Sequence, residues 1–158
     1  MPKNSGTYNQ LDTKSVRNDV TKTVTYLKNK LPSLVSHPLN VIFLGEEHRN
    51  QVDVGVVQHV LSHPPVLHEG ETRVIFERGL EYPIANGMDE REERMDPSLT
   101  HKARSKLIAD MIQDAFDEHD KNLVYVACGM NHAVEIFDAL NKTMLTNFGF
   151  IVKPSSTD

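Results

Sequence analysis

Residues 123–140 read LVYVACGMNHAVEIFDAL and join a strand pattern, a turn and a helix pattern. The opening apolar run, 123–128, is typical of a strand that is covered on both faces of a parallel sheet. A Gly-x-x-His segment from Gly129 to His132 follows at once, and the spacing of apolar residues over about 132–142 predicts a helix. The stretch therefore predicts one strand–turn–helix unit of an α/β protein.

Other parts of the chain repeat this alternation. Apolar runs predict three further strands, at 41–44, 73–76 and 148–152. Apolar residues at three- and four-residue steps predict helices over about 12–31, 51–62 and 98–119. Strands that alternate with helices predict a three-layer α/β/α domain with a mostly parallel sheet.

The expected domain organisation is simple. The chain has 158 residues, which is the size of one compact domain. We expect a flexible N-terminal tail over 1–10, a single α/β domain over 11–152 and a C-terminal tail over 153–158. Residues 80–97 hold proline, glycine and a charged run with few apolar residues. They predict either a solvated loop or surface helical turn, or a lid over a site, because long loops inside compact domains are often functional.

Composition excludes several classes of protein. A hydrophobic content of 39% allows a packed core, and the net charge of −5 argues against nucleic acid as a partner. No apolar run is long enough to predict a membrane helix, and the first ten residues lack the apolar stretch of a signal peptide. The single cysteine, Cys128, excludes an internal disulfide. We expect a cytoplasmic protein, or one delivered into a host or target-cell cytosol without a cleaved signal.

Polar side chains follow three of the predicted strands directly. Because the carboxyl ends of parallel strands meet at one edge of a sheet, where ligands bind in open α/β folds, these side chains are the candidate site. They are Glu46, His48, Glu77, Arg78, Asn131 and His132.

Imidazole and carboxylate groups at one edge could activate water in two ways. A divalent ion such as zinc or manganese, held by His48, His132 and Glu77, could activate water at neutral pH. Without a metal, Glu46 or Glu77 could act as a general base with a histidine partner. Substrate binding is expected from Arg78, which could hold an anionic group, together with Asn131.

These residues also have structural interpretations. Glu46 precedes a predicted helix, where negative charge is favoured by the helix dipole, and Asn131 suits a helix N-cap. Glu77 and Arg78 could form an ordinary ion pair. Cys128 could be a nucleophile beside a histidine or a buried structural cysteine. The repetition of Gly-x-x-His straight after two buried strands favours the functional interpretation of the set.

The remaining histidines are expected to be structural. His59 and His63 lie four residues apart, a spacing that can bind a metal, but they share a face with polar residues and predict a solvated surface. The others are expected in loops or on the surface: His37, His68, His101 and His119.

The ordered set of Gly45-x-x-His48, Glu77 and Gly129-x-x-His132 resembles the superfamily that groups TIKI and TraB proteins with ChaN-like and erythromycin esterase-like proteins. The resemblance extends from Val41 to Leu140. It implies an α/β/α fold and one of several activities: metal-dependent proteolysis, ester hydrolysis or haem binding. It also implies that His48 and His132 bind metal or act in catalysis, with Glu77 as the central glutamate and Glu46 as the glutamate of the GE-x-H segment.

We therefore predict a hydrolase that activates water through a His/Glu site, with or without a divalent metal, and acts on a small-molecule or peptide substrate. The alternatives that the sequence leaves open are a haem- or small-ligand-binding module on the same fold, a toxin or effector domain, and an interaction protein whose pocket residues are structural. The sequence does not predict the oligomeric state.

Overall fold

A parallel sheet forms the centre of the computed structural model, which describes residues 7–9, 25, 27–29, 37–46, 51–76, 84–92 and 98–153. The strand order is β1-β6-β2-β5-β3-β4, and each neighbouring pair is parallel. The strands are β1 (Thr7–Asn9), β2 (Leu39–Glu46), β3 (Thr72–Phe76), β4 (Met88–Glu92), β5 (Leu123–Gly129) and β6 (Phe148–Lys153). The predicted α/β class with a parallel sheet is confirmed.

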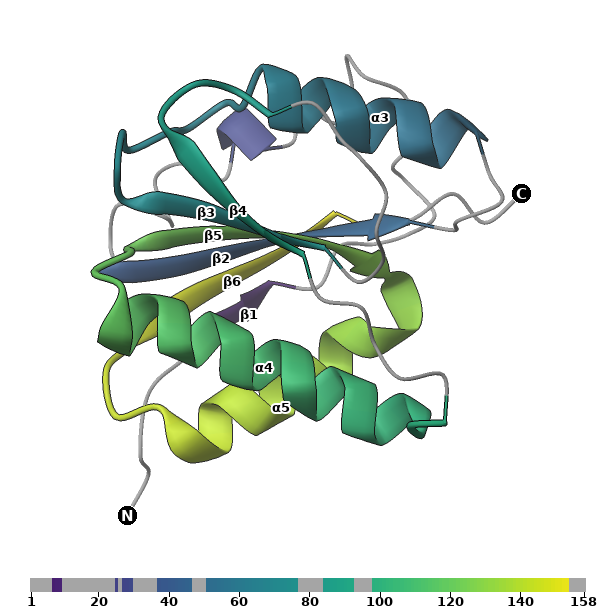
Figure 1. Ribbon diagram of the computed structural model, residues 1–158, viewed down its shortest axis with the longest axis vertical. Helices are drawn as coiled ribbons and strands as arrows, with labels where there is room; N and C mark the ends of the chain where they lie inside the picture. The colour runs from purple at the N-terminus through teal and green to yellow at the C-terminus, as the bar shows by residue number, and fades with distance from the viewer. Residues whose placement is uncertain are drawn as a thin grey trace.

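Helices cover both faces of this sheet. α3 lies on one face, and α4 and α5 lie on the other, so the domain has three α/β/α layers (Figure 1). The bounds are α3 (Gln51–Ser62), α4 (His101–Glu118) and α5 (Ala133–Thr143), with a 3-10 turn, η1 (Met130–His132), before α5. Three of the predicted helices are thus confirmed. Of the helix expected over 12–31, residues 25 and 27–29 are described, and they are helical.

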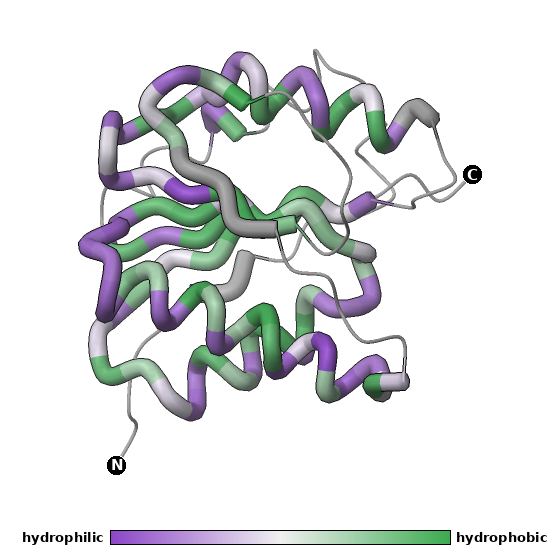
Figure 2. The backbone as a smooth tube through the Cα atoms, viewed as in Figure 1, coloured by the Kyte–Doolittle hydropathy of each residue, from purple (hydrophilic) through white to green (hydrophobic). Residues whose placement is uncertain are grey.

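The central strand β5 shows why the apolar runs form the middle of the sheet. Val124 and Val126 pack towards α4 and α5, whereas Tyr125 and Ala127 pack into a second apolar cluster on the α3 side. Figure 2 shows the hydrophobic colouring concentrated along the central strands and the hydrophilic colouring on the outer parts of the helices. Burying one such side chain stabilises the fold by about 1.5–3 kcal/mol, so a strand with apolar residues on both faces belongs between two helical layers.

The chain leaves the neighbouring strands β2 and β5 towards opposite faces of the sheet. After β2 it reaches α3, and after β5 it passes through η1 to α5 (Figure 1). The register places Glu46 of β2 beside Gly129 of β5 at the carboxyl ends of both strands. In open α/β sheets, a crevice forms where adjacent connections diverge in this way, and ligands bind there.

Two strands lie where the sequence predicted none. β1 lies within residues 1–10, which were expected to be a flexible tail, and pairs with β6. β4 lies within residues 80–97, which were expected to be a loop, a surface turn or a lid, and pairs with β3. Its sequence is MDERE, and edge strands often carry charged side chains because these discourage pairing with other chains. A search for apolar runs therefore misses it. The expected C-terminal tail also begins later, because Lys153 belongs to β6.

The helices in the described ranges are either too short or too polar to cross a lipid bilayer.

Candidate functional site

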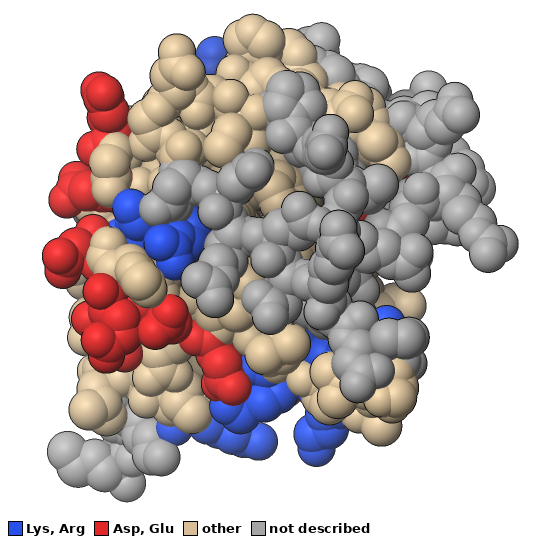
Figure 3. Space-filling model, viewed as in Figure 1, with Lys and Arg blue, Asp and Glu red and all other residues tan. Residues whose placement is uncertain are grey.

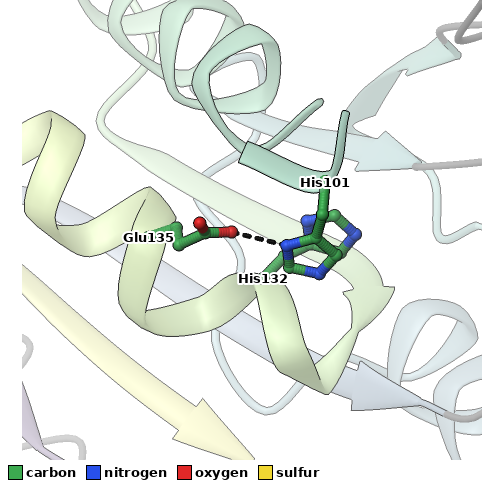
Figure 4. A group of neighbouring side chains, drawn as sticks. All are labelled: His101, His132 and Glu135. Atoms are coloured by element: carbon green, nitrogen blue, oxygen red, sulfur yellow. Dashed lines mark hydrogen bonds and ion pairs between the residues drawn. The ribbon is translucent and has the colours of Figure 1, made fainter. Parts of the chain in front are cut away.

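Three titratable side chains converge where α4 and α5 begin. They are His101 in the first turn of α4, His132 at the end of η1 and Glu135 in the first turn of α5. Each helix returns the chain between parallel strands, so both helices begin at the carboxyl edge of the sheet. One ligand atom from each residue lies within 4.8 Å of the others. Figure 4 shows the two imidazole rings overlaid and the carboxylate directed at His101.

The hydroxyl of Ser105 links the three side chains into one hydrogen-bonded chain. Its Oγ lies 2.7 Å from Nδ1 of His132 and donates to Oε1 of Glu135 at 2.8 Å. The same Oε1 lies 2.6 Å from Nδ1 of His101. Ser105 follows His101 by four residues on α4, and residues at this spacing lie on one helix face. The four side chains, His101, Ser105, His132 and Glu135, are called the His–Glu cluster below.

The His–Glu cluster has a buried half and an exposed half. His132 and Ser105 are only 3% and 1% exposed. In contrast, the side chains of His101 and Glu135 are 43% and 34% exposed. The two imidazole rings stack with centroids 3.8 Å apart and planes 9° apart. The buried ring therefore supports the exposed one, and solvent or a substrate can reach His101 and Glu135.

The surroundings of Glu135 favour its ionised form. The hydrogen bond from Ser105 is the main cause that lowers the pKa of Glu135 below its ordinary value of 4.5. Desolvation raises the pKa, while the hydrogen bond from His101 and the electrostatic interactions with His101 and His132 lower it further. The carboxylate is therefore charged at neutral pH and acts only as an acceptor.

Local sequence explains why each member of the cluster stands where it does. The hydroxyl of Thr100 accepts from the backbone N–H of Ala103 at 3.1 Å and caps α4, so the helix begins at His101. β5 ends at Gly129, and η1 then places His132 against the core. Glu135 lies in the first turn of α5, where the helix dipole stabilises a carboxylate. This last position is favourable in any helix, so the dipole alone does not make Glu135 a functional residue.

The charges on α4 oppose its helix dipole. Basic residues occupy its first turns and acidic residues its last turns, the reverse of the arrangement that stabilises a helix. Figure 3 shows acidic side chains along the left of the view, where the C-terminal end of α4 lies, and basic side chains below them. The basic residues are Lys102, Arg104 and Lys106, and the acidic ones are Asp114, Asp117 and Glu118. Lys106 is paired with Asp110, which leaves Lys102 and Arg104 to add positive potential near His101.

The donor set of the His–Glu cluster could hold a metal ion. Two imidazoles and a carboxylate are suitable ligands for zinc and similar divalent ions. The stacked arrangement adds a condition, because an ion in the plane of one ring lies outside the plane of a parallel ring. Since His132 is buried and His101 is exposed, binding of one ion by both rings would require His101 to rotate.

The structure describes half of the residues that the sequence predicted for the site. His132 belongs to the His–Glu cluster, in agreement with its predicted place at a strand end. The other described residues are Glu46 and Asn131; His48, Glu77 and Arg78 lie outside the described residues, so their roles as metal ligands, catalytic groups or substrate contacts stay predictions.

Glu46 is 3% exposed at the end of β2. Alternation along the strand places it on the α3 side, with Leu44, whereas His132 lies with α4 and α5. Its predicted catalytic role stays a prediction.

Asn131 is exposed, and the N-cap of α5 is His132, so the expected N-cap role of Asn131 is wrong. Its predicted role in substrate binding stays a prediction.

Sequence reasoning missed three members of the cluster. His101 was expected to be a loop or surface histidine; it is exposed, but it bonds to Glu135. The helix predicted over 98–119 returns the chain to the parallel strand β5, and this signal could have placed its start, and therefore His101, at the carboxyl edge. Ser105 and Glu135 then follow His101 and His132 at helical spacings of four and three.

The other residues considered from sequence are not members of the His–Glu cluster. Cys128 is buried on the α4 and α5 side of the sheet, which agrees with the structural interpretation of this cysteine. His59 is half-buried on α3 and His63 is exposed directly after this helix, and their rings stack with centroids 4.9 Å apart.

Comparison of the chain with protein-family models, with curated proteins and with solved structures found no match. The resemblance to the TIKI, TraB, ChaN-like and erythromycin esterase-like superfamily therefore stays a prediction from the two Gly-x-x-His segments.

Proposed function

We propose that this protein is a hydrolase whose attacking water is activated by the His–Glu cluster. The observation that supports this function best is the 2.6 Å bond between Glu135 and Nδ1 of the exposed His101. A carboxylate that accepts from one ring nitrogen orients the imidazole and stabilises the imidazolium that forms when the ring takes a proton. An imidazole held in this way acts as a general base towards a water molecule within hydrogen-bond reach.

A divalent metal would supply the same chemistry by a second route. His132, His101 and Glu135 would hold the ion, which would supply an activated water at neutral pH. Both routes lead to attack by an activated water on an ester, amide or phosphoryl centre. Activity and metal content, measured together, distinguish the two routes.

The proposed substrate is a small molecule or peptide that carries an anionic group. Lys102 and Arg104 lie within one turn of His101, and the positive end of the α4 dipole adds to their potential. An anionic group would be stabilised there beside the exposed half of the cluster.

The test compares hydrolysis and metal content in three variants with the wild type. Model esters, peptides and phosphate esters serve as substrates, and bound metal is measured by elemental analysis. We expect His101→Ala and His132→Ala to lower kcat/KM by roughly 10²-fold or more, the usual contribution of a general base. The matched control is His119→Ala, because His119 also pairs with a carboxylate, Asp114 at 3.2 Å, but at the other end of α4.

Metal in the wild type that is lost from both cluster variants would support the metal route, and activity without metal would support the direct route. Activity that is equal in all three variants, or a wild type that hydrolyses none of the substrates, would contradict the proposed function.

A further inference from the structure

We infer that Ser105 and Glu135 are positioning residues that hold both imidazoles of the cluster with hydrogen on Nδ1, so that the exposed His101 offers Nε2 to water or to a metal. The hydrogen assignment follows from the geometry of the cluster alone. Only the meaning of Nε2 for catalysis rests on the proposed function.

The bond between Glu135 and His101 determines the first ring. An ionised carboxylate has no hydrogen to donate, so the hydrogen between Oε1 of Glu135 and Nδ1 of His101 must belong to the imidazole. A neutral His101 that keeps this bond therefore carries its lone pair on Nε2.

The hydroxyl of Ser105 determines the second ring. It has one hydrogen and three neighbours: Nδ1 of His132 at 2.7 Å, the carboxylate of Glu135 at 2.8 Å and the backbone carbonyl of His101 at 3.2 Å. Donation to the carbonyl, like donation to His132, would leave the short contact between Oγ and the carboxylate without a hydrogen. If the hydroxyl donated to His132, two oxygen atoms would face each other at 2.8 Å without a hydrogen between them. If it donates to Glu135, every contact in the chain has one hydrogen, provided that Nδ1 of His132 donates to Oγ.

The carboxylate of Glu135 accepts hydrogen bonds from both parts of the cluster. Glu135 is the acceptor at the end of both branches, directly for His101 and through Ser105 for His132. Histidines that bind a metal usually donate their other ring N–H to a carboxylate or a backbone carbonyl, which fixes the tautomer and the orientation of the ring. In the metal-free route of the proposed function, Glu135 thus acts behind the imidazoles, and Ser105 extends its influence to the buried ring.

The tautomers can be measured directly in the full chain. Protein with ¹⁵N-labelled histidine gives long-range ¹H–¹⁵N spectra at neutral pH, in which protonated and unprotonated ring nitrogens have distinct shifts. The spectra of His101→Ala and His132→Ala assign the two rings. We expect both rings of the wild type to be protonated at Nδ1, and an unprotonated-type shift at each Nε2.

Variants separate a positioning role from a purely structural one. We expect Ser105→Ala to release the tautomer of His132 while His101 keeps its own, and Ser105→Thr to restore His132 because the hydroxyl returns. The matched control is Thr143→Ala, which removes another hydroxyl bond between α5 and α4, to Gln113 at 2.8 Å, and should change neither ring. If Ser105→Ala fails to fold, the wild type and Ser105→Thr still test the assignment.

A wild-type ring protonated only at Nε2, or a His132 tautomer that is unchanged in folded Ser105→Ala, would overturn the inference. Tautomers as expected in a protein without hydrolytic activity would support the inference and contradict only the proposed function. Hydrolysis by a protein whose two rings carry hydrogen on Nε2 would support the proposed function and contradict the inference.

Discussion

Substitution of Ser105 by alanine tests the buried half of the His–Glu cluster through stability. Ser105 is 1% exposed, and the change removes its hydroxyl, which lies 2.7 Å from a ring nitrogen of His132, a residue that is 3% exposed. His132 would then keep a buried N–H without that acceptor, which costs about 1–3 kcal/mol. Alanine is the better helix former, which offsets this loss of stability by a few tenths of a kcal/mol. Water can replace the hydroxyl at the partly exposed Glu135, so we expect a net loss of about 1–2.5 kcal/mol, dominated by His132.

Urea unfolding at neutral pH, followed by circular dichroism, measures this loss. The control is again Thr143→Ala, because Thr143 is exposed and its hydroxyl also bridges α5 and α4. Surface substitutions of that kind usually change the free energy of unfolding by no more than about 0.5 kcal/mol. If Ser105→Ala were as stable as the control, the bond between Ser105 and His132 would not be formed in solution, and the cluster described above would be wrong.

Three other changes test separate parts of the structure. Folding lowers the pKa of Glu135, so the carboxylate stabilises the folded state above the ordinary value of 4.5, and this stabilisation is lost as the pH falls through the lower folded value. Glu135→Gln should therefore make the free energy of unfolding fall less steeply with acid. Urea midpoints from about pH 6 to pH 3 measure this dependence. Tyr125→Phe should lower the free energy of unfolding in urea by about 0.5–1.5 kcal/mol, since the buried hydroxyl of Tyr125 donates to the carbonyl of Val66 at 2.6 Å. Because burial raises the pKa of Tyr125, this bond should persist in the wild type at alkaline pH. Lys102→Glu should raise the free energy of unfolding by about 0.3–1 kcal/mol, because it places a carboxylate at the positive end of α4, yet should lower kcat/KM for anionic substrates more than for neutral ones; equal effects on both would contradict the anionic preference.

The apolar runs were sufficient to predict most of the sheet. β2, β3, β5 and β6 are buried along almost their whole length, and a strand that must avoid water on both faces shows this need in consecutive residues. The edge strands escaped detection for the opposite reason. Among the described strands β4 pairs with β3 alone, and its residues are mostly charged.

The candidate site could be predicted only in part. His132 could be found because it follows a buried strand directly, so its position at the carboxyl edge depends on local sequence. His101 lies at the same edge because α4 returns the chain to the parallel strand β5. The sequence predicted that helix, but nothing in it indicated that His101 would meet His132 and Glu135.

The sequence by itself determined the α/β class, the parallel sheet and the edge at which His132 lies, because these features depend on the burial pattern of short segments. The tertiary structure alone decided which side chains meet His132. Its bond to Ser105 spans 27 positions, and the bond between His101 and Glu135 spans 34. Such contacts depend on how α4 and α5 pack against each other on one face of the sheet. The packing of one helix against another leaves no periodic signal in the sequence of either helix.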